Sequence, residues 1–377
     1  MSDLHTFFAA KHFADLPAND AAHALQVGRR IQAITETNPD WSEAEIVIIG
    51  CGESSGSTQN TAWSNAPDAV REELYRLYDW HSDIKVADMG NILQGATPAD
   101  TRAALRTVLR EVQEAGKVAI AIGGTHDLTL QQYDVFKKTE QTINAAVIDM
   151  LIDLEDAEGI SEDSYLMDML TGQPNFIRHY SHIGFQSYYA NPNMLETLDK
   201  LRFDCYRLGH VRADMDDMEP VLRNCDLLSI DMNVLRACDA PWNSGASPNG
   251  FFGDELCQLI RYAGMATHLS SLGIYGYRPE KDKHRLGAKQ IAQMLWYFID
   301  GYLVRKKEAK VEQAEDFTEY HVSLNKSDTI FLKSRRTNRW WMQLPDGRYA
   351  PCSYNDYLTA AANDIPERWF REQERVV

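Results

Sequence analysis

Residues Val118 to Asp153 read VAIAIGGTHDLTLQQYDVFKKTEQTINAAVIDMLID, and their pattern indicates the fold class. The stretch opens with an apolar run that ends in Gly123-Gly124 and leads to His126. After a helix-like interval, a second apolar run, AAVID, ends at Asp149. Short apolar runs that alternate with helical intervals are typical of buried strands in a parallel α/β sheet. Both predicted strands therefore lead into a side chain capable of binding a metal ion.

The same arrangement recurs later in the chain, where the run DLLSIDMN over residues 226–233 delivers Asp231. In open α/β sheets, ligands bind in the crevice at the carboxyl ends of the strands. Imidazole and carboxylate groups that gather at such an edge suit a divalent cation. We therefore interpret the three strand ends as a metal site built on a parallel sheet.

Strands and helices alternate from about residue 45 to residue 305. Further strands are predicted over 45–51, 83–89, 179–189, 205–211 and 271–277. Helices are predicted from Ala66 onward and over 98–115, 255–264 and 289–306. This alternation predicts an α/β protein with a three-layer, doubly wound and mostly parallel sheet. We expect one such domain over residues 1–312.

The composition changes at Lys306, where the charged segment KKEAKVEQAED begins. Beyond it, the runs YHVSL, TIFLKS and RWWMQL predict strands, and SYNDYLTAAA predicts a helix. We expect residues 313–377 to form a small α+β extension packed on the main domain. Adjacent residues of a strand face opposite ways. We therefore expect at least one of Trp340 and Trp341 to be buried against the main domain, rather than stacked on nucleic acid.

The overall charge and the cysteine pattern exclude several classes of partner. The chain of 377 residues carries 38 basic and 55 acidic residues, for a net charge of -17. This balance argues against general binding to nucleic acid or to an anionic membrane. The start of the chain, residues 1–16, has no signal-peptide pattern and predicts a short amphipathic helix. No cysteine pair has CxxC spacing. We expect reduced thiols in a cytoplasmic protein.

The ordered motifs resemble one known family. These are G-G-x-H at His126, D-x-x-x-D at Asp149 and Asp153, and S-x-D at Asp231, together with the loop DAPWNSGASPNG. In this order, they are similar to the ureohydrolases arginase, agmatinase and formimidoylglutamase, and most of all to the formimidoylglutamase branch. The resemblance covers roughly residues 45–305. It implies an arginase-like fold, hydrolysis of a linear C–N bond in a guanidino or formimino group, a small-molecule substrate and a homo-oligomer.

The resemblance also implies a ligand set. In the family, two manganese ions share bridging carboxylates and activate one hydroxide. His126, Asp149, Asp153 and Asp231 match the protein ligands of one ion, with Asp149 and Asp231 as the bridging pair. One imidazole and three carboxylates suit a cation such as Mn²⁺.

Three positions depart from the family pattern. Leu151 replaces a histidine and Asn233 replaces an aspartate, and both family residues are ligands of the second ion. Gly276 stands where the family has a glutamate that binds guanidinium. We therefore expect one Mn²⁺ ion, a degenerate second site and no arginase activity. Asn233, with Ser247 and Asn249 of the following loop, is a candidate for substrate binding, whereas the catalytic residues stay unassigned.

Alternatives exist for these residues and for the function. His126 could belong to the core, Asp149 and Asp153 could cap a helix, and Asn233 could close a turn. The chain could also be a non-catalytic protein of the same fold that keeps at most one ion. A general sugar- or nucleotide-binding protein is a third hypothesis, which the absence of GxGxxG and GxxxxGK[ST] disfavours.

Overall fold

A central sheet organises the main domain, as shown by a computed structural model that describes residues 4–9, 24–57, 64–155, 158–324 and 327–374. Within these residues the sheet has ten strands in the order β1-β4-β3-β5-β10-β9-β6-β7-β8, with β2 paired to β4. All of its pairs are parallel except β1 with β4. The strands are β1 Phe8–Ala9, β2 Gln32–Ala33, β3 Ile46–Gly50, β4 Val86–Ile92, β5 Val118–Ile122, β6 Ile143–Ile148, β7 Ile177–Phe185, β8 Asp204–Arg207, β9 Leu227–Asp231 and β10 Ser271–Tyr275.

Both faces of the sheet are buried, because its strands are continuous apolar runs. In β3, Ile46 and Ile48 pack into one hydrophobic cluster, while Val47 and Ile49 pack into another on the opposite face. This alternation follows from the two-residue period of a strand. The expected three-layer, doubly wound sheet is therefore confirmed.

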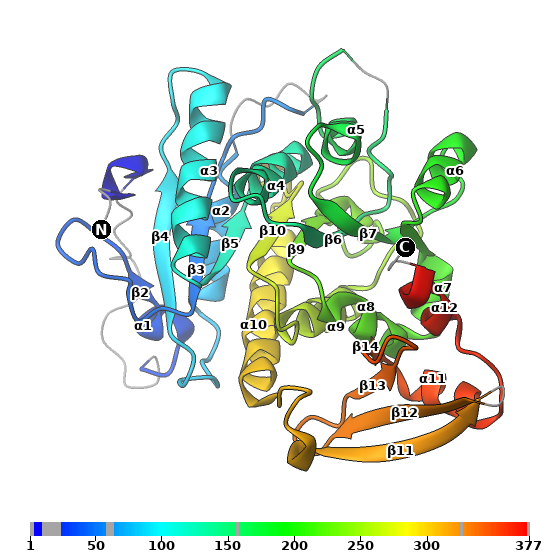
Figure 1. Cartoon of the computed structure of the whole chain (residues 1–377). Helices are drawn as coiled ribbons and strands as arrows, with labels where there is room; N and C mark the ends of the chain where they lie inside the picture. The colour runs from blue at the N-terminus through cyan, green and yellow to red at the C-terminus, as the bar shows by residue number, and fades with distance from the viewer. Residues whose placement is uncertain (1–3, 10–23, 58–63, 156–157, 325–326, 375–377) are drawn as a thin grey trace.

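Helices cover the two faces as separate layers (Figure 1). One layer contains α2 Ala66–Leu74, α7 Leu208–Ala213, α8 Met218–Arg223, α9 Gly253–Gly264 and α10 Leu286–Lys307. The other contains α3 Pro98–Glu114, α4 Thr129–Lys138, α5 Tyr165–Thr171 and α6 Pro192–Lys200. A short helix, α1 Val27–Arg30, precedes the sheet core. In the described part of the chain, no helix has both the length and the apolar character that crossing a bilayer requires.

Two expected elements differ in the structure. The strand predicted over 205–211 ends at Arg207, and α7 begins at Leu208. Leu208 and Val211 are both buried in the same cluster, and their spacing of three fits one face of a helix. At the start of the chain, Leu4–Phe7 is a 3₁₀ helix and Phe8–Ala9 is a strand. The rest of the amphipathic helix predicted there, residues 1–3 and 10–16, lies outside the described residues.

The C-terminal residues form a second, antiparallel sheet (Figure 1). Its order is β11-β12-β13-β14, and two helices follow it. The elements are β11 Phe317–Leu324, β12 Ser327–Ser334, β13 Trp340–Gln343, β14 Tyr349–Cys352, α11 Tyr354–Ala361 and α12 Glu367–Glu374. We refer to residues 317–374 as the C-terminal module. Its mixture of strands and helices agrees with the predicted α+β extension.

The two tryptophans of β13 are both buried, and they lie in different clusters. Trp340 stacks on Tyr357 within the module. The guanidinium of Arg223, from α8 of the main domain, lies 4.5 Å from the ring centre of Trp341. The two rings therefore face opposite ways, as expected, and Trp341 anchors the module to the main domain.

Buried charges complete this junction. Arg339 of the module donates from Nη1 to Glu219 Oε1 at 3.1 Å and from Nε to Glu308 Oε2 at 2.6 Å. Arg223 donates to the carbonyl oxygen of Trp340 at 2.5 Å and also pairs with Glu219. Burial alone would raise the pKa of Glu219, but the two arginines outweigh it and lower this pKa. The contribution of Glu219 to stability is therefore complete at neutral pH and is lost as the pH falls through this lowered pKa.

We predict that Arg339→Ala destabilises the protein by about 3–5 kcal/mol, the usual cost of removing one partner of a buried ion pair. The matched control is Arg336→Ala, because Arg336 pairs with Asp316 on an exposed surface. The control should cost about 0–1 kcal/mol. Urea unfolding followed by tryptophan fluorescence measures both values. Equal, small losses in the two variants would show that the buried pairs do not hold the module.

Candidate metal centre

The predicted ligand residues lie at the carboxyl edge of the central sheet. Asp231 closes β9, and Asp149 directly follows β6. These strands are neighbours with Ile148 opposite Ile230, so the next residue of each, Asp149 and Asp231, emerge side by side. His126 begins a short 3₁₀ helix after β5.

A glycine turn makes the approach of His126 possible. Gly123 and Gly124, between β5 and His126, have φ angles of 110° and 64°. These values lie in the region that residues with a side chain rarely adopt. A Cβ on Gly124 would also lie 2.2 Å from the carbonyl oxygen of Glu53. The Gly-Gly pair is therefore required by backbone conformation and by space.

The imidazole of His126 faces three carboxylates through one nitrogen. Its Nδ1 lies 2.9 Å from Asp149 Oδ2, 3.0 Å from Asp153 Oδ2 and 3.7 Å from Asp231 Oδ2. Suitable atoms of His126, Asp149 and Asp153 all lie within 4.8 Å of one another. All four predicted side chains therefore converge on one point, and each is buried.

The other ring nitrogen of His126, Nε2, contacts two hydroxyl groups on the side away from the carboxylates. It lies 3.0 Å from Ser229 Oγ and 3.2 Å from the hydroxyl of Tyr165. Ser229 is hydrogen-bonded in turn to Thr129. Such partners fix the ring orientation and tautomer of a metal-binding histidine. Ser229 belongs to the S-x-D motif and could have been assigned from sequence, whereas nothing in the local sequence marks Tyr165.

Burial and mutual repulsion perturb the pKa values of this group. Burial, followed by the charge of Asp149, raises the pKa of Asp231 to about 7 and that of Asp153 well above its ordinary value. Burial would lower the pKa of His126, but hydrogen bonds to Asp149 and Asp153 raise it well above the usual range. Ionising all three buried carboxylates together is therefore unfavourable unless a cation joins them, and a dication would supply that charge.

One oxygen in this group is poorly satisfied by the protein. Asp149 Oδ2 is fully buried, and apart from its 2.9 Å contact with His126 Nδ1 it has no hydrogen-bond partner in the described part of the chain. Its partner oxygen, Oδ1, accepts from the backbone N–H of Leu151 at 2.9 Å. Buried polar atoms are nearly always satisfied, so such an exception requires an explanation. An imidazole nitrogen, an unsatisfied carboxylate oxygen and two further carboxylates fit a divalent ion such as Mn²⁺.

The two positions that depart from the second-site pattern lie close together. Asn233 Oδ1 accepts from the backbone N–H of Met150, next to Leu151, at 3.4 Å. The backbone N–H of Asn233 donates to Asp231 Oδ1 at 2.7 Å. Both Leu151 and Asn233 are partly exposed. Both positions thus border the ligand cluster.

Gly276 also borders the cluster. Its φ is 78°, and a Cβ built on it would lie 2.3 Å from Asp231 Oδ1. No side chain fits here without moving Asp231. The sequence has no carboxylate at this position, and the space beside Asp231 could not hold one.

The other two substrate-binding candidates lie in the loop after β9. Ser247 is buried, and its hydroxyl donates to Gln186 Oε1 at 3.0 Å. The side-chain amide of Gln186 donates to the carbonyl oxygen of Asn249. Residue Asn249 itself is exposed. These contacts tie the loop to the end of β7, and the two residues stay predictions as substrate ligands.

The acidic residues Glu162 and Asp163, a few positions after Asp153, are partly buried. Burial, followed by the charges of Glu162 and Glu155, raises the pKa of Asp163 to about 6. Glu162 accepts from Ser57 Oγ at 3.2 Å and lies 3.6 Å from the guanidinium of Arg278. This part of the loop therefore packs beside the ligand cluster. Asp156 lies outside the described residues.

Comparison with known proteins identifies similar chains. A family model described as the arginase family matches residues 44–300. Formimidoylglutamase of Citrobacter koseri is 23% identical over 304 residues, which cover 75% of this chain and 95% of that protein.

Solved structures share the fold. Formimidoylglutamase of Bacillus subtilis superposes with a TM-score of 0.67 at 16% identity, covering 78% of this chain and 96% of that one. Formiminoglutamase of Trypanosoma cruzi with Mn²⁺ gives a TM-score of 0.65 at 18% identity, covering 71% and 96%. The C-terminal module lies beyond the residues that the family model matches.

We predict that Mn²⁺ raises the melting temperature of the wild-type chain and that Asp153→Asn abolishes this rise. An ion at a hundredfold excess over its dissociation constant stabilises the folded state by about 2.7 kcal/mol. The matched control, Asp163→Asn, removes a nearby carboxylate for which the described residues show no ion pair with His126, and it should keep the rise. Thermal unfolding and elemental analysis measure both. A normal manganese content in Asp153→Asn would contradict the ligand assignment.

Proposed function

Because this chain belongs to the arginase family, we propose that it is a metal-dependent hydrolase of linear C–N bonds, of the formimidoylglutamase type. The observation that carries this proposal is the convergence of His126 with three aspartates at the carboxyl edge of the sheet. The similarity to curated formimidoylglutamases along three quarters of the chain supports the choice within the family.

His126, Asp149, Asp153 and Asp231 would hold one Mn²⁺ ion. A bound ion of this kind lowers the pKa of a water molecule enough to supply hydroxide near neutral pH. The chain itself orients the donors. Ser229 and Tyr165 hold the imidazole of His126 so that its Nδ1 faces the carboxylates. The backbone N–H groups of Leu151 and Asn233 donate to Asp149 and Asp231 and fix the orientation of these carboxylates.

The substrate class follows from what surrounds the ligands. A guanidinium is a permanent cation and needs a carboxylate partner. Gly276 supplies none, and Asp231 leaves no room for one. The site therefore lacks the carboxylate that holds a guanidino group, and the similarity to formimidoylglutamases supports a formimino group instead. We propose Asn233, Ser247 and Asn249 as substrate-binding residues, with Asn233 nearest to the metal ligands.

A second candidate function is non-catalytic, with one ion retained as a structural or ligand-binding element. Leu151 and Asn233 favour it, because leucine cannot coordinate a metal and an amide oxygen is a weaker ligand than a carboxylate. The two functions differ in turnover and share the same metal ligands.

The direct test is turnover of N-formimidoyl-L-glutamate by the manganese-loaded chain, measured as product release, with arginine and agmatine as comparison substrates. We expect turnover of the formimidoyl compound alone. Asp231→Asn should reduce it by at least about a hundredfold, since even residues behind metal ligands cost ten- to hundredfold. Asp163→Asn serves as the control. Full manganese occupancy with no turnover would establish the non-catalytic alternative.

We further predict that the double variant Leu151→His with Asn233→Asp binds a second manganese ion. The proposed bridging residues Asp149 and Asp231 are already in place, and the two substituted positions border them. Each single variant is a control, because it supplies only one of the missing ligands. Manganese per chain is counted by elemental analysis. A count in the double variant equal to that of the wild type would show that the pocket has changed beyond these two positions.

A further inference from the structure

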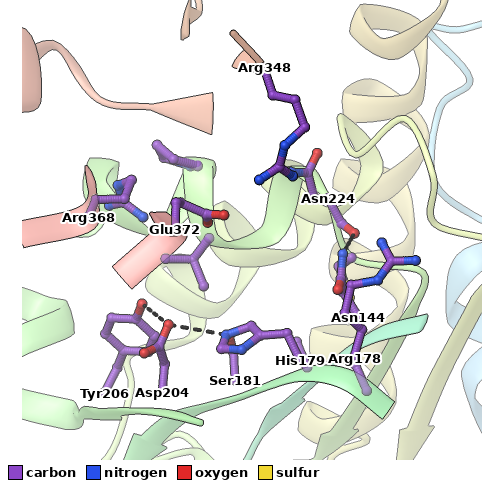
Figure 2. Close-up of a pocket in the computed structure, with 15 residues that line it drawn as sticks. Asn144, Arg178, His179, Ser181, Asp204, Tyr206, Asn224, Arg348, Arg368 and Glu372 are labelled. Atoms are coloured by element: carbon purple, nitrogen blue, oxygen red, sulfur yellow. Dashed lines mark hydrogen bonds and ion pairs between the residues drawn. The ribbon is translucent and has the colours of Figure 1, made fainter. Parts of the chain in front are cut away.

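A polar cavity lies at the amino-terminal half of β6, opposite to the end that is followed by Asp149. Figure 2 shows residues that line it. Its volume is about 360 Å³. The first residues of β6 and β7 line it together with β8, α8 and the C-terminal module. This cavity contains none of the residues proposed for the hydrolase function.

A backbone irregularity brings Arg178 to this cavity. In the β6–β7 pair, Ile143 lies opposite Ile177, but Asn144 lies opposite His179. Arg178 is therefore the extra residue of a β-bulge. Bulges redirect a side chain and recur beside functional sites. Both Arg178 and His179 line the cavity, although neighbours in a regular strand face opposite ways.

Buried polar side chains form the floor of the cavity. His179, Ser181 and Asp204 are each less than a tenth exposed. His179, Ser181 and Ile183 are two positions apart and share one face of β7, and Ile183 belongs to the main hydrophobic cluster. Polar groups in such positions are costly unless they are hydrogen-bonded. Asp204 is paired with Arg371 at 2.9 Å and with His179 at 3.2 Å.

These three residues do not form a nucleophilic triad. Ser181 Oγ and Asp204 Oδ2 both lie 3.2 Å from the same atom, His179 Nε2. A triad requires the hydroxyl and the carboxylate on different ring nitrogens. The arrangement suits binding rather than catalysis.

Two guanidinium groups are available at the cavity. Arg178 is exposed, and no ion pair to it is found among the residues that the structure describes. Arg348 pairs with Asp346, two residues earlier, but both side chains are well exposed. Exposed pairs of this kind hold a guanidinium only weakly. A third arginine, Arg368, is already bound to Asp217 and Asp356.

We propose that this cavity binds a small organic anion, with a carboxylate or phosphate group held between Arg178 and Arg348. Figure 2 shows Arg348 reaching in from the module and Arg178 rising from the sheet. Planar guanidinium groups are suited to both kinds of oxyanion. His179 and Asn224 supply polar groups for the rest of the ligand. The ligand would thereby bridge the main domain and the C-terminal module.

The test is isothermal titration calorimetry of the full chain without added metal, using succinate in one arm and inorganic phosphate in the other. Binding of at least one probe at one site per chain is expected, and the arm that binds identifies the class of anion. Arg178→Gln and Arg348→Gln should each weaken this binding roughly tenfold or more, the effect expected for loss of a charge-assisted hydrogen bond. Both side chains are exposed, so folding should be preserved.

Two matched variants complete the design. Glu372 lines the same cavity, and Glu372→Gln removes a negative charge, so it should strengthen anion binding several-fold. Arg335 is an exposed arginine of the module that bonds to Thr318 and does not line the cavity. Arg335→Gln should leave the affinity unchanged. The proposal is overturned if neither probe binds, or if Arg178→Gln and Arg348→Gln both retain the wild-type affinity.

Discussion

Three carboxylates and one imidazole are buried together at the carboxyl edge of the sheet, and the fold has to accommodate their charges. Residues as distant in sequence as His126 and Asp231 meet only because β5, β9 and β6 are parallel and end at one edge. Their repulsion and burial raise the pKa values of Asp153 and Asp231. Because these carboxylates are buried away from solvent, their negative charges need a positive charge among them. The Gly-Gly turn, Ser229 and Tyr165 serve that arrangement.

The sheet and the ligand cluster could be predicted because they depend on local patterns. The apolar runs that end at Asp149 and Asp231 specify buried strands, and parallel strands bring their carboxyl ends together. Other features depend on tertiary contacts. Tyr165 reaches His126 from a helix with no motif, and Leu208 begins a helix where alternation predicted a strand. The steric conflict between Gly276 and Asp231 likewise appears only in three dimensions.

The strand β6 connects two different parts of the molecule. Its carboxyl end delivers Asp149 to the metal ligands, and its first residues line the cavity beneath the C-terminal module. The module is held to the main domain by Arg339, Arg223 and Trp341, through contacts that are largely buried. The arrangement places a polar cavity at a firmly held junction, on the side of the sheet away from the proposed chemistry.

His126 and the three aspartates are proposed to bind one cation. A crystal structure of the manganese-loaded chain, with anomalous data at the manganese edge, tests this assignment. We expect one strong anomalous peak, with His126 Nδ1 and oxygens of Asp149, Asp153 and Asp231 at about 2.0–2.3 Å, the range of such metal–ligand bonds. A manganese peak elsewhere, with these four side chains hydrogen-bonded only to one another, would contradict it.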